Sequence, residues 1–395
     1  MLHSRQSVSA KLLVVAVALG ACNVFTDADE AALQRPGGGG DDQGASTGAT
    51  VASTSGAGGG TSTGGGAASN GATTGTAMGI CSPECAANAY CEAASNSCVC
   101  DPGFFMQGGV CVAAPVGDPT THTQVEVCDR WTTGHVVTEP DPLVTNGQQC
   151  DAGSLKTGGI TDTLLRINMF RWMVGVGPTS NDPALDAKAQ LCANLESWWD
   201  WNLPDSPHQP PSGVTCYTAE GAATAGESNL AWGSGHPAAA MDQYVQDSGN
   251  ATTMGHRRWV LYPPLDPIGI GYWKGGGMYG DAQCLRVFGA SGTGPNPEWL
   301  AFPPPGFVPV DVTGWTWTFH GALAGLSTST ASVVRVDDGA ALGVKMLPLQ
   351  QGYGQDAISW DPVGWSAVAG ETYRVTITGL AGGDIVYDVK PVSCG

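Results

Sequence analysis

Apolar side chains in the middle third of the chain recur at the spacing of partly buried helices. Between positions 159 and 174 they stand one, three and four residues apart, which predicts a helix with a buried face. The residues that carry this spacing are Leu164, Leu165, Ile167, Met169, Phe170, Met173 and Val174. Gly175 and Gly177 follow and indicate the end of this helix.

Two further helices are predicted downstream. Asp182 can cap a helix that runs from Pro183 to Trp199, because a short polar side chain before a proline is typical of a first turn. A third helical stretch spans Pro237 to Gln246 and stops just before Asp247. These three helices and the turns between them predict that the middle of the chain is a folded domain.

Strands are predicted after the helices. Apolar residues alternate with glycines from 268 to 272, and 285–288 can return after a glycine turn at 275–277. Helices followed by antiparallel strands indicate an α+β fold over 159–292. From 293 to 395 short alternating runs between turns predict a small β-sandwich. It holds one histidine, His320, so adhesion or packing against the middle domain is the expectation for it.

The N-terminus predicts export. Arg5 and Lys11 precede an apolar run of ten residues, 12–21, which is too short to cross a bilayer as a helix. The run ends in Leu19-Gly20-Ala21-Cys22, which resembles a bacterial lipobox. That resemblance implies a signal peptide over 1–21 and lipidation of Cys22. The lipid would anchor the protein in a membrane, at the bacterial outer membrane or cell surface. An ordinary secretory signal is the alternative.

Composition adds a tether and excludes one class of partner. Residues 22–80 are rich in glycine, serine and threonine with almost no large apolar side chain, which predicts a disordered tether. The whole chain has 35 acidic and 16 basic residues, a formal charge of −19. Such a charge repels phosphate backbones and argues against nucleic acid as a partner.

Cysteine usage agrees with an oxidising compartment. Thirteen cysteines less Cys22 leave twelve, an even number that fits disulfides. The first six, spaced C-x3-C-x5-C-x6-C-x-C-x10-C, resemble an EGF-like module over 81–113. The resemblance implies the pairs Cys81 with Cys91, Cys85 with Cys98, and Cys100 with Cys111. No carboxylate stands just before Cys81, so we expect a spacer rather than a calcium-binding module, followed by a connecting segment over 114–158.

The other six cysteines predict three more disulfides whose pairing the sequence leaves open. They are Cys128, Cys150, Cys192, Cys216, Cys284 and Cys394. One pair that we expect to be useful is Cys192 with Cys216, because it would brace the loop that carries His208. These bonds are expected to stabilise the fold rather than to perform redox chemistry.

Four side chains in three short phrases are the candidates for chemistry. They are His208, Glu227, Asp247 and His256, and separations of 19 (227 − 208) and 29 (256 − 227) mean that only tertiary folding can gather them. Two imidazoles and two carboxylates suit a divalent metal or a polar ligand head group. The alternative is structural, with these groups only hydrogen-bonding across a cleft.

With these residues in view, the middle domain resembles the CAP, or SCP-like, family of extracellular proteins. The likeness covers Ile160 to Ala290, and its phrases are Asn168-x-x-Arg171, Pro183-Ala184-Leu185-Asp186-Ala187-x-Ala189, His208, Gly226-Glu227 and Gly255-His256-Arg257. It implies an α-β-α sandwich whose central cleft is lined by His208, Glu227 and His256. Asp247 then matches a second family glutamate, because it stands three residues after Tyr244.

Three departures from the family pattern carry their own expectations. Asp247 is one methylene shorter than glutamate, so we expect it to reach the cleft through water. Ser228 interrupts the usual Gly-Glu-Asn order and displaces Asn229 by one helical position. The inserted stretch 250–254 predicts a longer, looser loop before His256.

The sequence therefore favours a surface-anchored binding protein that is not an enzyme. Its cleft is expected to hold a small-molecule or lipid ligand and, weakly, a divalent cation, with zinc preferred and His208 and His256 as the ligands. An extracellular metal-dependent hydrolase of peptide or cell-wall bonds is the alternative, with Glu227 as base, although no His-Glu-x-x-His helix motif is present. A structural envelope or adhesion protein is the third. The ligand's identity, any protein partner and the oligomeric state stay open.

Overall fold

The computed structural model describes residues 89–92, 97–100, 104–107, 110–113, 118–289 and 291–395. The expected signal peptide, Cys22, the tether, Cys81 and Cys85 lie outside these residues. The described chain falls into two compact units, with the division after Ala113. Among the described residues, no helix has the length and apolar character needed to cross a membrane.

The smaller unit contains two short antiparallel hairpins. Strand β1 (Ala89–Glu92) pairs with β2 (Ser97–Cys100), and β3 (Phe104–Gln107) pairs with β4 (Val110–Ala113). Cys98 takes part in a disulfide. The bonds implied by the EGF-like resemblance involve residues that the structure does not describe in full, so this pairing stays a prediction.

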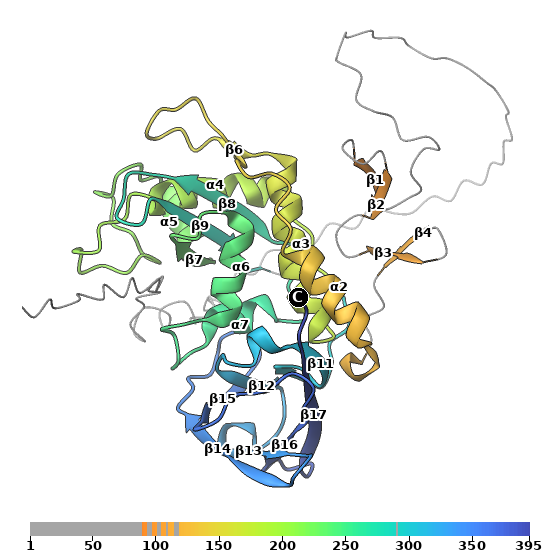
Figure 1. Cartoon of the computed structure of the whole chain (residues 1–395). Helices are drawn as coiled ribbons and strands as arrows, with labels where there is room; N and C mark the ends of the chain where they lie inside the picture. Colours follow the sequence, from red (N-terminus) through yellow and green to blue (C-terminus); the bar gives the residue numbers. More distant parts are fainter. Residues whose placement is uncertain (1–88, 93–96, 101–103, 108–109, 114–117, 290) are drawn as a thin grey trace, which may run out of the picture. The chain divides into compact units, whose positions relative to one another are not determined.

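The larger unit begins with the helices that surround a three-stranded sheet (Figure 1). The helices are α2 (Gln124–Gly134), α3 (Thr157–Met173), α4 (Pro183–Glu196), α5 (Ala219–Ala225), α6 (Pro237–Gln246) and α7 (Gly255–Val260). A 3-10 turn, η2 (Pro119–Thr121), precedes them, and β5 (Leu143–Val144) pairs with β6 (Ser154–Leu155). The predicted bounds of the second and third helices agree with α4 and α6 to within three residues.

The central sheet has the antiparallel order β7-β9-β8. Its strands are β7 (Ser228–Trp232), β8 (Gly269–Lys274) and β9 (Asp281–Arg286). Nearly every residue in them is buried, which requires cover on both faces: α4 packs on β8 and β9, and α6 packs on β7 and β8. The predicted α+β layered fold is confirmed. Strand β7 was not predicted, and it places Ser228 and Asn229 on a strand rather than at helical positions.

Glycines in β8 let helix α4 lie unusually close to the sheet. A Cβ on Gly271 would stand only 2.0 Å from the carbonyl oxygen of Ala189, and one on Gly269 would stand 2.6 Å from that of Leu185. Any larger side chain would force the helix away. The alternation of apolar residues with glycine therefore marks a strand whose glycine face touches α4.

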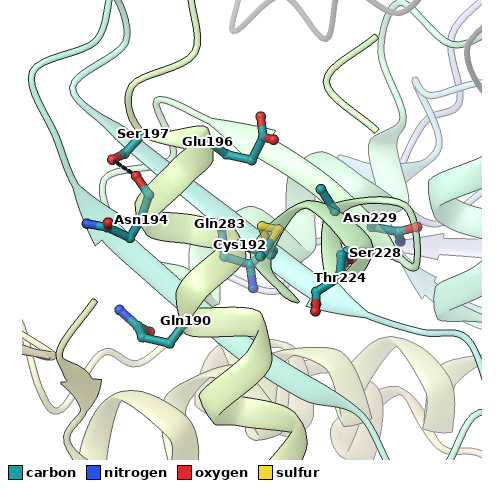
Figure 2. Close-up of a disulfide and its surroundings, with 12 residues drawn as sticks. Gln190, Cys192, Asn194, Glu196, Ser197, Thr224, Ser228, Asn229 and Gln283 are labelled. Carbon is teal, nitrogen blue, oxygen red and sulfur yellow. Dashed lines mark hydrogen bonds between the residues drawn. A yellow bond between two sulfur atoms is a disulfide. The ribbon is translucent and has the colours of Figure 1, made fainter. Parts of the chain in front are cut away.

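Three disulfides fix the larger unit. Cys192 on α4 bonds to Cys284 on β9 within a buried apolar cluster. Figure 2 shows this disulfide and the polar side chains around it. The others are Cys150–Cys216 and Cys128–Cys394. The expected pair Cys192–Cys216 is wrong, because α4 lies flat on the sheet and presents Cys192 to β9.

The C-terminal region is all β, as expected. One curled eight-stranded sheet has the order β10-β12-β15-β14-β13-β16-β17-β11. The strands are β10 (Trp299–Phe302), β11 (Gly306–Pro309), β12 (Trp317–Gly321), β13 (Thr330–Arg335), β14 (Ala340–Leu347), β15 (Ala357–Val363), β16 (Tyr373–Thr378) and β17 (Ile385–Val392), with 3-10 turns η3 (Val310–Val312) and η4 (Leu326–Thr328).

The curl brings side chains from distant strands of that sheet together. The ring of Tyr387 on β17 lies 5.6 Å from that of Trp299 on β10, between centroids, although six positions in the strand order separate them. The two inner faces of the predicted sandwich are thus parts of one continuous sheet, closed around an aromatic core.

Candidate functional site

His208 lies in the loop after α4 and is buried against the end of α5. Only 2 % of the residue is exposed, and its Nδ1 lies 2.9 Å from the carbonyl oxygen of Ala225. Gly226 permits this close approach, since a Cβ there would meet the His208 carbonyl oxygen at 3.2 Å. The Gly-Glu phrase at 226–227 therefore has a local structural reason, which is room for the histidine backbone.

His256 is the second residue of helix α7 and contacts Asp247. The two side chains are almost fully buried, and Nδ1 of His256 lies 2.9 Å from Oδ1 of Asp247. Asp247 follows the last residue of α6 with φ +56°, a left-handed backbone that turns its carboxylate toward α7. The expectation that Asp247 needs a bridging water is wrong in one respect: it contacts His256 directly.

The stretch between α6 and α7 is packed rather than loose. Asn250, Thr253 and Met254 are all buried, and the Met254 amide donates to the Asn250 carbonyl oxygen at 2.8 Å. Asn250 also donates through Nδ2 to Asp247, at 3.3 Å. The expected loose loop is therefore wrong, because its polar groups bond to each other and fix the approach to His256.

The neighbouring strand supports the same histidine from its other side. Asn229 on β7 donates through Nδ2 to the carbonyl oxygen of His256 at 3.0 Å, and the ring of Tyr244 lies 5.4 Å from the imidazole. The Tyr244 hydroxyl in turn donates to the Asn229 carbonyl oxygen at 3.0 Å. Asn229 thus has a positioning role, which the helical register assumed from the sequence had obscured.

The two histidines lie within electrostatic reach of each other. Burial lowers the pKa of His208 to about 4; the hydrogen bond with Ala225 opposes this, and the electrostatic interaction with His256 lowers that pKa further. His208 is therefore neutral at pH 7. A neutral imidazole is the form that coordinates metal or accepts a hydrogen bond from a ligand.

Glu227 has different surroundings. Its carboxylate accepts a hydrogen bond from Nε of Arg286 at 2.7 Å, and 41 % of its side chain is exposed. Its carbonyl oxygen accepts from the amides of Val287 and Phe288. The structure thus gathers His208, His256 and Asp247, while the described side-chain contact of Glu227 is with strand β9.

The donor set suits a weak metal site better than a catalytic zinc centre. Both imidazoles are oriented through Nδ1, one by a backbone carbonyl and one by a carboxylate, which is the usual outer support of metal-binding histidines. Within the part of the chain that the structure describes, no group of three or more His, Cys, Asp or Glu side chains is placed to hold a metal ion. His208 and His256 are the residues of this region that could hold an ion.

Arg257, which follows His256 in the family phrase, has a role that the sequence did not predict. It is fully buried, and its guanidinium donates to the carbonyl oxygens of Val245, Gln246 and Thr316. Its backbone amide donates to Oδ2 of Asp247 at 3.2 Å. Arg257 thereby connects the carboxylate behind His256 to the C-terminal sheet. Its position next to the second histidine was the available signal.

Comparison with known proteins bears on this region alone. Residues 164–284 match the family model named CAP, the cysteine-rich secretory protein family. This stretch is a CAP domain. No curated protein and no solved structure matches the chain. The resemblance seen in the sequence is confirmed over these residues, and the CAP domain contains His208, Asp247 and His256.

Proposed function

We propose that the histidine pair of the CAP domain, His208 and His256, is a non-catalytic binding site for a small polar or lipid ligand and, weakly, for a divalent ion. The observation that supports this most strongly is the fixing of both rings through Nδ1 in a buried setting. Because the two residues are only 2 % and 1 % exposed, a ligand or ion would reach the imidazoles only when the surrounding side chains move. Zinc, when bound, would supply a positive charge that attracts a carbonyl or anionic oxygen.

Zinc uptake tests the ion. Full-length protein stripped with a chelator is titrated with zinc alone by calorimetry, and we expect about one ion per chain. The double variant His208→Ala, His256→Ala should take up none, whereas His135→Ala, which changes a half-exposed histidine, should bind like the wild type. Equal uptake by the wild type and the double variant would refute the metal site.

Asp247 offers a sharper measurement on the same site. Asp247→Asn keeps the size of the side chain but removes the charge that orients His256, so zinc affinity should fall about 10- to 100-fold. Asp388→Asn, in the C-terminal sheet, is the control and should have no effect. An unchanged affinity in Asp247→Asn would mean that His256 is not a ligand.

The natural ligand can be sought without assuming its identity. Protein purified from its own cells is extracted with organic solvent, and small molecules are compared by mass spectrometry with those from the double histidine variant. A compound enriched only in the wild type supports the proposal. Glu227→Gln should retain that compound, since Arg286 already engages this carboxylate; its loss would favour the hydrolase alternative, in which Glu227 contacts the bound molecule.

We further propose that the protein is exported and anchored through lipidated Cys22, so that the CAP domain is displayed at the bacterial envelope. Three disulfides in the larger unit support an oxidising compartment. Labelling cells with an alkyne-tagged fatty acid should mark the wild type, and Cys22→Ser should lose both the label and the membrane fraction. Label retained by Cys22→Ser would contradict the anchor.

A further inference from the structure

A cavity of ≈ 790 Å³ lies where the CAP domain meets the C-terminal sheet. Its wall comes from the end of α3 at Val174 and Gly175, from the segment 295–301 that enters β10, and from strands β16 and β17. Neither histidine of the pair lines it. Ligand sites favour such junctions, and this volume lies within the range of about 300–1,000 Å³ that holds small organic ligands.

Aromatic rings form one side of the cavity. Trp299 lines it and is half-buried, and one face of its indole is stacked on Phe319, with centroids 5.2 Å apart and planes 24° apart. Tyr387 also lines the cavity and supports Trp299 at 5.6 Å. A ring held rigidly on one face is a platform for a flat apolar surface on the other.

Charged groups of both signs surround this platform. Arg374 and Asp388 are joined by two hydrogen bonds of 2.8 Å each, and both line the cavity. Exposed Asp118, Glu298 and Lys390 complete the charged part of the lining. With both signs nearly balanced, the cavity offers many donors and acceptors but little attraction for a strongly charged molecule.

Two polar features at the cavity favour a ligand that can form hydrogen bonds. The hydroxyl of Tyr387 has no hydrogen-bond partner within the described chain, and the residue is only 6 % exposed, so a bound molecule would reach this hydroxyl after a shift of neighbouring side chains. A buried hydroxyl in that condition is unfavourable unless something supplies a partner. The last turn of α3 also ends at the cavity, and the negative end of a helix attracts hydroxyl donors.

We propose that this junction cavity binds a neutral oligosaccharide of roughly two to three rings. A sugar ring combines an apolar C–H face, which suits Trp299, with hydroxyls that both donate and accept, which suits the mixed rim and the Tyr387 hydroxyl. A purely apolar ligand would leave the charged rim without hydrogen-bond partners. This site is independent of the histidine pair and of any metal.

Saturation-transfer NMR and calorimetry test the proposal on the full chain. The probes are the neutral trisaccharides maltotriose, cellotriose, mannotriose and chitotriose. We expect at least one to bind, with the strongest saturation on its ring C–H protons. Trp299→Ala should weaken that binding about tenfold or more, and Tyr387→Phe, which keeps the ring but removes the hydroxyl, should weaken it a few-fold.

Substitutions of exposed residues test whether a loss of binding results from misfolding. Glu298→Ala and Lys390→Ala change groups at the rim without touching the core, so both should fold normally and lower affinity about two- to tenfold. The double variant His208→Ala, His256→Ala should bind the sugar like the wild type. Failure of all four sugars to bind, binding that survives Trp299→Ala, or binding of a polyproline peptide in place of every sugar would each overturn the proposal.

Discussion

Arginine side chains are buried in the CAP domain but lie at the surface of the C-terminal sheet. In the CAP domain, Arg171 and Arg257 are fully buried and donate to carbonyl oxygens. In the sheet, Arg335 and Arg374 form ion pairs at the surface, with side chains 34 % and 50 % exposed. The sheet is instead held by aromatic packing, as between Trp317 and Trp360.

The two regions therefore depend on different interactions for their stability. A buried guanidinium that satisfies several carbonyl oxygens cannot be removed without leaving those oxygens unpaired, whereas an exposed ion pair is screened by water. We therefore expect the CAP domain to be sensitive to the loss of single charges and the sheet to tolerate it.

The largest effect is expected from Arg257→Ala. It removes a buried cation from three carbonyl oxygens and from the neighbourhood of Asp247, so the free energy of unfolding should fall by about 3–5 kcal/mol. Arg374→Ala, in the sheet, is the matched control and should change it by less than about 1 kcal/mol. Equal losses, measured by urea denaturation, would remove the contrast.

Loss of the buried disulfide should follow in size. The double variant Cys192→Ala, Cys284→Ala releases a loop of 92 residues, and chain entropy together with lost packing predicts a decrease of about 3–4 kcal/mol in the free energy of unfolding. Circular dichroism under denaturant measures it. A loss below about 1 kcal/mol would show that the packing of α4 on β8 and β9 suffices without the bond.

The burial of His208 predicts that the CAP domain loses stability at low pH. Its pKa is about 4 when folded and 6.5 when unfolded, so between these values the unfolded chain binds the extra proton. Stability should fall by about 3 kcal/mol as pH drops through that window. His208→Gln should lose this component when unfolding is followed from pH 7 to pH 4. An unchanged pH slope would contradict the buried neutral ring.

Glu196 should have a smaller effect on stability, and in the opposite direction with pH. It is fully buried at the end of α4, where Figure 2 shows its carboxylate pointing away from the disulfide, and burial raises its pKa well above 4.5. Above pH 4.5 the unfolded chain releases a proton that the folded protein retains, so stability falls as pH rises. Glu196→Gln should therefore be more stable than the wild type at pH 7 and similar to it at pH 4, as measured by urea denaturation at the two pH values.

A matched substitution checks that result. Glu220→Gln changes a glutamate whose side chain is 53 % exposed and pairs with Lys188, so its stability should differ from the wild type by less than about 1 kcal/mol at either pH. Stabilisation of both variants to the same extent would mean that total charge, rather than burial of Glu196, is responsible.

Local signals explain which parts of the fold could be predicted. Helices α4 and α6 begin at proline after a capping side chain, and Gly175, with φ +80°, follows the C-cap of α3. These signals can be read from neighbouring residues. Strand β7 and helix α7 are short, and their burial comes from surrounding elements rather than from their own pattern. Periodicity therefore found α3, α4 and α6 and missed β7 and α7, and helix α2 was also not predicted, because the segment 114–158 was expected only to connect two domains.

The candidate site shows the same limit. The residue types were visible, but the left-handed turn at Asp247 that brings its carboxylate to His256 has no sequence marker, since glycine would be the usual choice there. The role of Arg257 depends on carbonyl oxygens of a distant segment, Thr316 among them. Pairing of Cys192 likewise depends on which strand lies beneath α4.

The bond between Cys128 and Cys394 joins positions 266 residues apart, one on α2 and the other at the penultimate residue. The polypeptide between them is therefore a closed covalent loop. A protease that cuts any single peptide bond inside it leaves one connected molecule, and a force applied at Cys394 reaches α2 through the disulfide without first separating strand β17 from its neighbours.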